Sequence, residues 1–170
     1  MNLDGPLYCM DANVLIQAWQ KYYSPKLCPS YWETLNKLGA AGRLFIPSEV
    51  FKEIKKGEDD LYDWLKSSKI VVRPMTSMVA QNWTAILAKD PRHQLLVDNT
   101  KNRSLADPWV IAHAMTENAV VVTKEEKETA ANSKRIKIPN VCETMGIRCI
   151  NDFEMIGELG VRFTCTVQVD

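Results

Sequence analysis

Residues 7–13 read LYCMDAN: a short apolar run is followed directly by Asp11 and, two residues later, by Asn13. The run does not alternate between apolar and polar side chains, which is typical of a β-strand covered on both faces. Four further runs of this kind lie at 44–46, 70–72, 119–122 and 147–150. The sequence therefore predicts five short buried strands.

Helix-compatible stretches lie between these runs, at 13–23, 30–42, 48–56, 59–67, 77–89, 107–117, 138–145 and 153–159. Gly39 and Gly57 near two of their ends, and Pro108 at the start of another, fit helix termini. The alternation predicts an α/β fold with helices on both faces of a central, mostly parallel sheet. We expect a single three-layer α/β/α domain over residues 1–170.

Two segments depart from this alternation. Residues 90–106 are polar and carry several basic side chains, so we expect a long surface loop or lid that is locally basic. Residues 161–169 alternate apolar and polar side chains, which is the period-two pattern of a half-exposed strand. We expect 161–170 either to add a strand at a sheet edge or to contact a second subunit.

The 170-residue chain has the composition of a soluble globular domain, with 46% apolar and 25% charged residues. No apolar run approaches the roughly 20 residues that a membrane span needs, and Met1 is not followed by a basic and then an apolar segment. We therefore expect neither a membrane protein nor a secreted one, and predict a cytoplasmic location.

The cysteine pattern and the net charge exclude two kinds of binding site. Five cysteines without a CxxC pattern, and only two histidines, offer no Cys/His zinc site and indicate a reducing compartment. The 21 basic and 21 acidic residues cancel, so the molecule has no overall field to hold nucleic acid. A polynucleotide would have to bind locally or through a metal ion.

Acidic residues that follow the apolar runs are candidates for a site, because ligands of open parallel sheets bind beyond the carboxyl ends of the strands. Asp11 follows the first run, although it could equally cap the next helix. Asp107, just before Pro108, is also a natural N-cap. Asp107 nevertheless heads the buried stripe of its helix, where a carboxylate needs donors or a cation.

Two more strand ends are followed by acids. Beyond the second run, Glu53 lies about 105° and Glu49 about 145° from the centre of the apolar helix face, at about 100° per residue. Glu53 is thus expected to border the buried side, and Glu49 to be a surface charge in the first turn. Beyond the fourth run come Thr123 and Glu125, for which a solvated loop is the alternative.

Carboxylates that converge from separate segments repel one another, and they stay ionised together at neutral pH only around a cation. Because the oxygen ligands come without a thiolate or imidazole set, we expect a hard ion, Mg²⁺ or Mn²⁺. Such an ion lowers the pKa of a bound water that can attack a phosphodiester, so no side-chain nucleophile is required.

The segments that carry these residues resemble the PIN domain, in order and in spacing: 10–16 (MDANVLI), 47–57 (PSEVFKEIKKG), 106–114 (ADPWVIAHA) and 121–125 (VVTKE). The resemblance spans residues 7–152 and is nearest to VapC-type toxins or to an uncharacterised bacterial PIN-like subfamily beside them. It implies a metal-dependent ribonuclease, the toxin of a toxin–antitoxin pair.

The resemblance also implies three metal-site acids and two supporting polar residues: Asp11, Glu53 and Asp107, with Asn13 and Thr123. The family commonly has Asp or Asn after the strand-end threonine, whereas this chain has Lys124 and then Glu125. We therefore expect Glu125 to be the fourth catalytic acid. Implied partners are RNA as substrate, an antitoxin that fills the acidic pocket, and, as in many members, a second copy in a homodimer.

Aromatic and basic side chains near these acids are candidate RNA contacts: Trp19, Arg92, Lys101, Arg103 and Lys124. Trp19 could stack on an unpaired base, although with Tyr22 and Tyr23 it forms a stripe at helical spacing that is more often core. The basic residues could neutralise phosphates, and a solvated charged loop is the simpler alternative.

Two other functions fit parts of the pattern. A haloacid-type phosphatase also begins with an aspartate at the end of the first strand, but it needs a second aspartate where this chain has Asn13. A PIN-like scaffold or regulatory binding module that has lost catalysis is the other alternative, and it predicts an intact fold without Mn²⁺-dependent cleavage.

Overall fold

The computed structural model describes residues 5–57, 59–97, 106–130, 133 and 135–164. In these residues five short strands form a parallel sheet in the order β3-β2-β1-β4-β5. Their bounds are β1 Tyr8–Met10, β2 Leu44–Pro47, β3 Val71–Arg73, β4 Val120–Val122 and β5 Cys149–Ile150. The predicted strands are confirmed, but β3 is not fully buried, because it forms an edge of the sheet with Val71 39% exposed.

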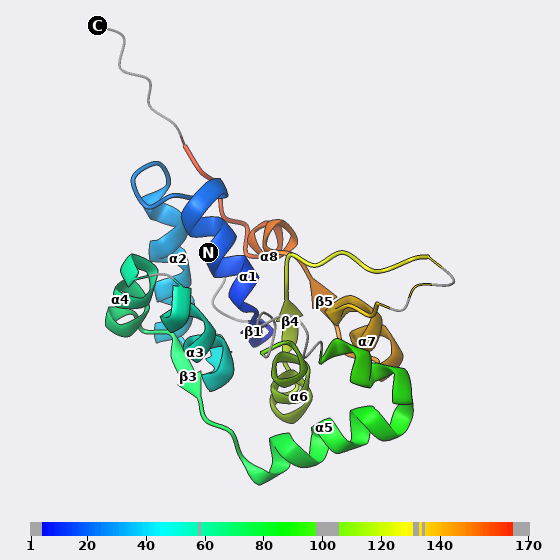
Figure 1. Ribbon diagram of the computed structural model, residues 1–170. Helices are drawn as coiled ribbons and strands as arrows, with labels where there is room; N and C mark the ends of the chain where they lie inside the picture. Colours follow the sequence, from blue (N-terminus) through cyan, green and yellow to red (C-terminus); the bar gives the residue numbers. More distant parts are fainter. Residues whose placement is uncertain (1–4, 58, 98–105, 131–132, 134, 165–170) are drawn as a thin grey trace, which may run out of the picture.

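Eight α-helices connect and cover the strands in the described part of the chain: α1 Ala12–Gln17, α2 Pro29–Ala40, α3 Ser48–Gly57, α4 Asp59–Ser67, α5 Ser77–Lys89, α6 Asp107–Glu117, α7 Ile138–Met145 and α8 Asp152–Glu158. Figure 1 shows α5 and α6 on one side of the sheet and α2 and α8 on the other. α6 packs on β1, β2 and β4, with α5 outside it. This is the predicted three-layer α/β/α architecture. None of the described helices combines the length and the apolar character that a membrane span requires.

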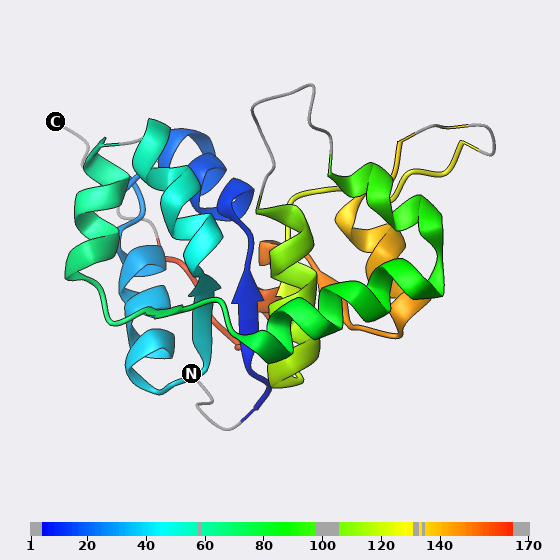
Figure 2. The same ribbon diagram turned by 60° about the horizontal axis from the view of Figure 1, so that its bottom comes forward.

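The register of β1 against β4 decides which side chains meet at the carboxyl edge of the sheet. Met10 lies opposite Val122, and the pairing continues past both strands, since the Asp11 N–H donates to the Val122 carbonyl at 3.0 Å. The Thr123 N–H donates to the carbonyl of Ile150 on the other side, also at 3.0 Å. The arrows of β1 and β2 point to the same edge, from which α1 and α3 begin (Figure 2). Asp11 and Thr123 are therefore neighbours by register.

The segment 90–106 differs from the expected surface loop. Pro91–Leu96 forms a 3₁₀-helix, η2, in which His93 is fully buried and Leu96 nearly so. The His93 ring is held because its Nδ1 lies 2.7 Å from the Ile86 carbonyl oxygen of α5. The loop prediction is therefore wrong for 91–96, whereas the surface position holds for four of the six residues. The polar composition gave no sign that His93 and Leu96 point inward. Residues 98–105 lie outside the described part.

The predicted edge strand at 161–170 falls mostly outside the described residues. Residues 161–164 are described and have no strand structure, and 165–170 are not described. The edge strand and the contact with a second subunit therefore stay predictions.

Gly39 lies in the last turns of α2, and its role is a close approach rather than a helix stop. A Cβ at this position would lie 2.6 Å from backbone atoms of Lys69 and Ile70. The chain that leads into β3 thus crosses α2 with no space for a methyl group. Glycine is required here because of the neighbouring backbone.

Gly39→Ala should lower the free energy of unfolding by about 1 to 3 kcal/mol, because the backbone at 69–70 must shift to admit the methyl group. Gly157→Ala is the matched control, since a Cβ there meets open space within α8. Alanine in a helix interior should stabilise it by up to about 1 kcal/mol. Urea denaturation of both variants measures the difference, and equal effects would contradict the close approach.

Candidate active site

The Asp11 carboxylate lies at the carboxyl end of β1 and is almost completely buried, with 2% of the residue exposed. The Thr123 hydroxyl donates a hydrogen bond to Asp11 Oδ2 at 2.9 Å. Asp11 occupies the N-cap position of α1, but its side chain makes no capping hydrogen bond there. The helix-cap alternative therefore does not account for this carboxylate, which is held by the end of β4.

A hydrogen-bond network beside Asp11 fixes the turn after β4. Asn13 Nδ2 donates to Thr123 Oγ1 at 3.2 Å, and Asn13 Oδ1 accepts from the Lys124 backbone N–H at 2.9 Å. The Glu125 N–H donates to Thr123 Oγ1 at 3.1 Å. Because the Thr123 oxygen accepts these donors, its single hydrogen is free to be directed at Asp11. The structure thus brings both predicted supporting residues to the predicted acid.

Glu53 and Asp107 come from two further elements, α3 and α6. Glu53 is half-buried and accepts a hydrogen bond from the backbone N–H of Ala106. Asp107 follows immediately, is 8% exposed and is the first residue of α6, whereas Ala106 holds the N-cap position. Asp107 is therefore not the N-cap that the sequence offered as an alternative, and Glu53 contacts the backbone next to it.

Glu125 is anchored on α7. Its carboxylate accepts hydrogen bonds from the Ile138 N–H at 2.8 Å and from Lys137 Nζ at 3.0 Å. Ile138 is the first residue of α7, so Glu125 lies at the positive end of the helix dipole. This is more than the solvated loop that was the alternative, because the side chain ties the turn after β4 to a helix.

The acids of this edge act on one another. The pKa of Asp11 is raised to about 7, first by burial and then by the negative charges of Glu125 and Glu53, while the hydrogen bond from Thr123 opposes the rise. Burial also raises the pKa of Glu53, against the opposing charge of Lys56. Asp11 therefore interacts electrostatically with two carboxyl groups from other segments, Glu53 of α3 and Glu125 after β4.

A preformed metal centre is not part of this geometry. The described residues contain no group of three or more histidine, cysteine, aspartate or glutamate side chains arranged to hold a metal ion. The predicted metal site at Asp11, Glu53 and Asp107, and the catalytic role of Glu125, therefore stay predictions. Chemically, the edge offers oxygen donors of negative charge, one of which titrates near neutral pH.

The candidate RNA contacts that the structure describes differ in their exposure and in their partners. Trp19 is half-buried, and its ring packs against Trp32 at 4.8 Å between centroids, so the core alternative describes it better. Arg92 is at the surface but is paired with Asp90 at 2.6 Å. The Lys124 prediction is corrected: its ammonium is buried in an ion pair with Asp152 and does not face solvent. The remaining two candidates, Lys101 and Arg103, lie outside the described residues.

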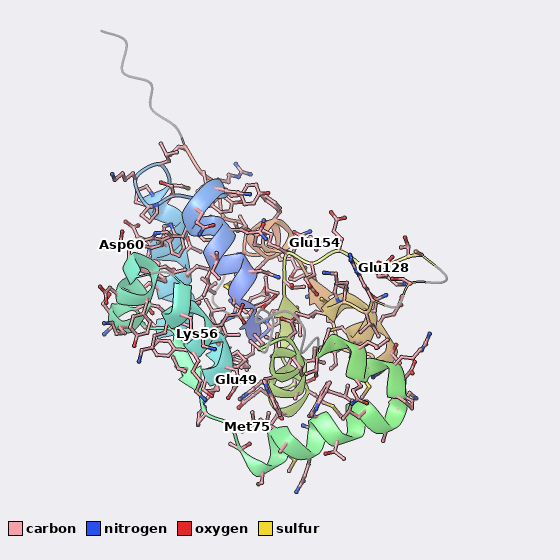
Figure 3. All side chains as sticks on the ribbon, viewed as in Figure 1. Glu49, Lys56, Asp60, Met75, Glu128 and Glu154 are labelled. Atoms are coloured by element: carbon pink, nitrogen blue, oxygen red, sulfur yellow. The ribbon has the colours of Figure 1, made fainter. Side chains whose placement is uncertain are left out.

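One buried polar pair was missed. Glu49, expected at the surface, lies at the side of α3 that faces α6 (Figure 3). Its Oε2 is 3.9 Å from Nε2 of His113 in α6. The Ser48 hydroxyl donates to the other carboxylate oxygen at 2.9 Å. Burial lowers the pKa of His113, which the charge of Glu49 opposes. The available signal was the one-turn spacing of Glu49 and Glu53, which places both acids beside α6.

Asp11→Asn should make the metal-free protein more stable at pH 8 and leave its stability unchanged at pH 3.5. The Asp11 carboxyl, with a pKa of about 7 in the folded protein, does not lower the free energy of unfolding at a pH where it is protonated in both the folded and the unfolded state. Its destabilising effect grows between about pH 4 and pH 7 and is complete above pH 7. The shift of about three pKa units limits the gain to about 4 kcal/mol. Thermal unfolding with a chelator present measures it.

The exposed Asp60 of α4 is the matched control, and Asp60→Asn should change stability by less than about 0.5 kcal/mol at either pH. A loss of stability in Asp11→Asn at pH 8 would instead assign the side chain an ordinary structural role.

Comparison with known proteins agrees with this geometry at the level of the fold. The crystal structure of VapBC2 from Rickettsia felis bound to a DNA fragment from their promoter is similar at a TM-score of 0.55 and 16% sequence identity, with 85% of this chain and 98% of that chain covered. This likeness confirms the PIN-like fold. No curated protein matches the chain. The model of the family described as "Domain of unknown function (DUF4411)" matches residues 8–163, and the chain therefore belongs to the DUF4411 family.

Proposed function

We propose that the protein is a metal-dependent ribonuclease that hydrolyses RNA phosphodiester bonds, as the toxin of a toxin–antitoxin pair. The observation that carries this proposal is the buried Asp11 carboxylate, whose pKa of about 7 reflects burial together with the charges of Glu125 and Glu53. Carboxylates that come from distant segments and lie close together repel one another, and a cation bound among them stabilises their ionised form.

The residues present fit Mg²⁺ or Mn²⁺. These ions prefer oxygen ligands, and Mg²⁺ is commonly held by one or two carboxylates with its remaining positions filled by water. A ready three-ligand cluster is therefore not required for binding. Asp11, Asp107 and Glu53 would hold the ion, which, when bound, supplies an activated water and offsets charge at the phosphate.

The chain's own residues have defined tasks in this proposal. Thr123 orients the Asp11 carboxylate through its hydroxyl, and Asn13 keeps Thr123 and the Lys124 N–H in register with α1. Glu125, held by the N-terminus of α7, adds negative charge that acts on Asp11. Thr123 and Asn13 are thus positioning residues, and the acids are the groups that contact ion and substrate.

An antitoxin is the proposed protein partner. The PIN-like fold is shared with a VapBC2 structure that was solved bound to a promoter DNA fragment. A basic side chain of the partner would pair with the acidic edge and so occupy the place of the ion. A catalytically silent scaffold is the second candidate, and Lys124 at the position where PIN domains commonly have an acid or amide favours it.

Cleavage of a single-stranded RNA in the presence of Mn²⁺, Mg²⁺ or a chelator tests the proposal. The wild type should cleave only with the ion, Asp11→Asn and Asp107→Asn should abolish cleavage, and Asp60→Asn should cleave normally. Thr123→Val should reduce the rate by about 10- to 100-fold, as expected for a residue that orients a ligand. A folded wild type that binds Mn²⁺ but leaves RNA intact would support the scaffold instead.

A further inference from the structure

Lys124 is the residue directly after Thr123, and its side chain leaves the acidic edge. Its Nζ lies 2.5 Å from Asp152 Oδ1, with the two side chains only 9% and 0% exposed. The ammonium also lies 3.9 Å from the centroid of the Phe153 ring and 4.5 Å from that of Tyr22. Two aromatic faces and one carboxylate thus form a seat for this cation.

Helix α8 carries two of the three groups of this seat, Asp152 and Phe153. Asn151 and Glu154 close a capping box at the start of α8, with hydrogen bonds of 2.8 and 2.9 Å, so Asp152 takes no part in capping. Apart from their ion pair, neither Lys124 Nζ nor the Asp152 carboxylate has a hydrogen-bond partner among the described residues, so each is the main polar contact of the other. Removing one partner of a buried ion pair is costly, because the other charge is then left uncompensated.

The same lysine is attached to the candidate active site through its backbone. The Lys124 N–H donates to Asn13 Oδ1, and the preceding Thr123 donates to Asp11. A flexible four-carbon stem connects this backbone to the ammonium. Were Asp152 neutral, the ammonium would have no carboxylate partner in the seat, while the edge to which its backbone is bonded carries the charges of Glu125 and Glu53. An ammonium among them would take the place of a metal ion.

We propose that Asp152, with Tyr22 and Phe153, is a positioning device that holds the Lys124 ammonium away from the acidic edge and so keeps that edge open to a divalent cation. This inference rests on the proposed function. It explains how the chain tolerates a lysine at a position where PIN domains commonly have an acid or amide. It also makes Lys124 a competitor of the ion rather than an RNA contact.

Calorimetric titration of Mn²⁺ into three variants tests the proposal. Asp152→Asn should weaken Mn²⁺ binding about tenfold, because the released ammonium competes for the carboxylates. The double variant K124M/D152N replaces the pair with neutral side chains of similar size and should bind within about threefold of the wild type. Lys127→Met, in the same loop and paired with Glu143, is the matched control and should bind normally.

A second set covers the case in which Asp152→Asn fails to fold. Tyr22 and Phe153 are 52% and 54% exposed, so their removal leaves the core intact. Tyr22→Ala/Phe153→Ala should weaken Mn²⁺ binding about threefold in the wild-type background and leave it unchanged in the K124M/D152N background. In NMR spectra, the Lys124 side-chain protons should be shifted upfield by the two rings in the wild type and lose this shift in the ring variant.

Two results would overturn the inference: wild-type Mn²⁺ affinity in Asp152→Asn, or a double variant as weak as Asp152→Asn, which would make the pair a plain structural support. Ring removal with equal effects in both backgrounds would overturn it as well. A wild type that binds no Mn²⁺ overturns the proposed function and this inference with it, whereas a wild type that binds, with variants that do not follow the pattern, overturns the inference alone.

Discussion

The hydrogen bond from Thr123 to Asp11 joins the ends of β4 and β1, and the chemistry of the carboxyl edge depends on it. Parallel pairing of β1 with β4 brings the two residues together, and burial on both faces of the sheet removes Asp11 from water. A carboxylate in this position is costly unless a donor or a cation compensates it. The threonine supplies part of that compensation, and the remainder is what a divalent ion would contribute.

The same edge combines charges of both signs that are kept apart by helices. The N-terminus of α7 and Lys137 hold Glu125, while α8 holds Lys124 through Asp152. Helix α7 therefore positions the negative charge of Glu125 beside the site, and α8 holds the positive charge of Lys124 away from it. The neutral net charge of the chain conceals this local separation, which only the tertiary arrangement creates.

Most of the fold was predictable because each short apolar run is separated from the next by one or two stretches with helix signals. Asp11 and Thr123 could be placed at one edge, since residues that follow parallel strands share it. The burial of His93 could not be predicted, because the polar composition of this segment does not indicate that two side chains of a 3₁₀-helix point inward. Glu49 was misplaced because the helical wheel of α3 was referred to one apolar face, whereas α6 contacts a neighbouring one. The orientation of the Lys124 side chain depends on Asp152, which is 28 residues away in the sequence. Nothing in the sequence around Lys124 indicates this ion pair.

Proton release on metal binding tests the central claim most directly. Because the Asp11 carboxyl is partly protonated at pH 7, Mn²⁺ that binds there must displace a proton. Calorimetry in buffers of different ionisation enthalpy should show a fraction of a proton released per ion at pH 7, and none at pH 9 or in Asp11→Asn. Binding without proton release at pH 7, or equal affinity in Asp11→Asn, would contradict the account.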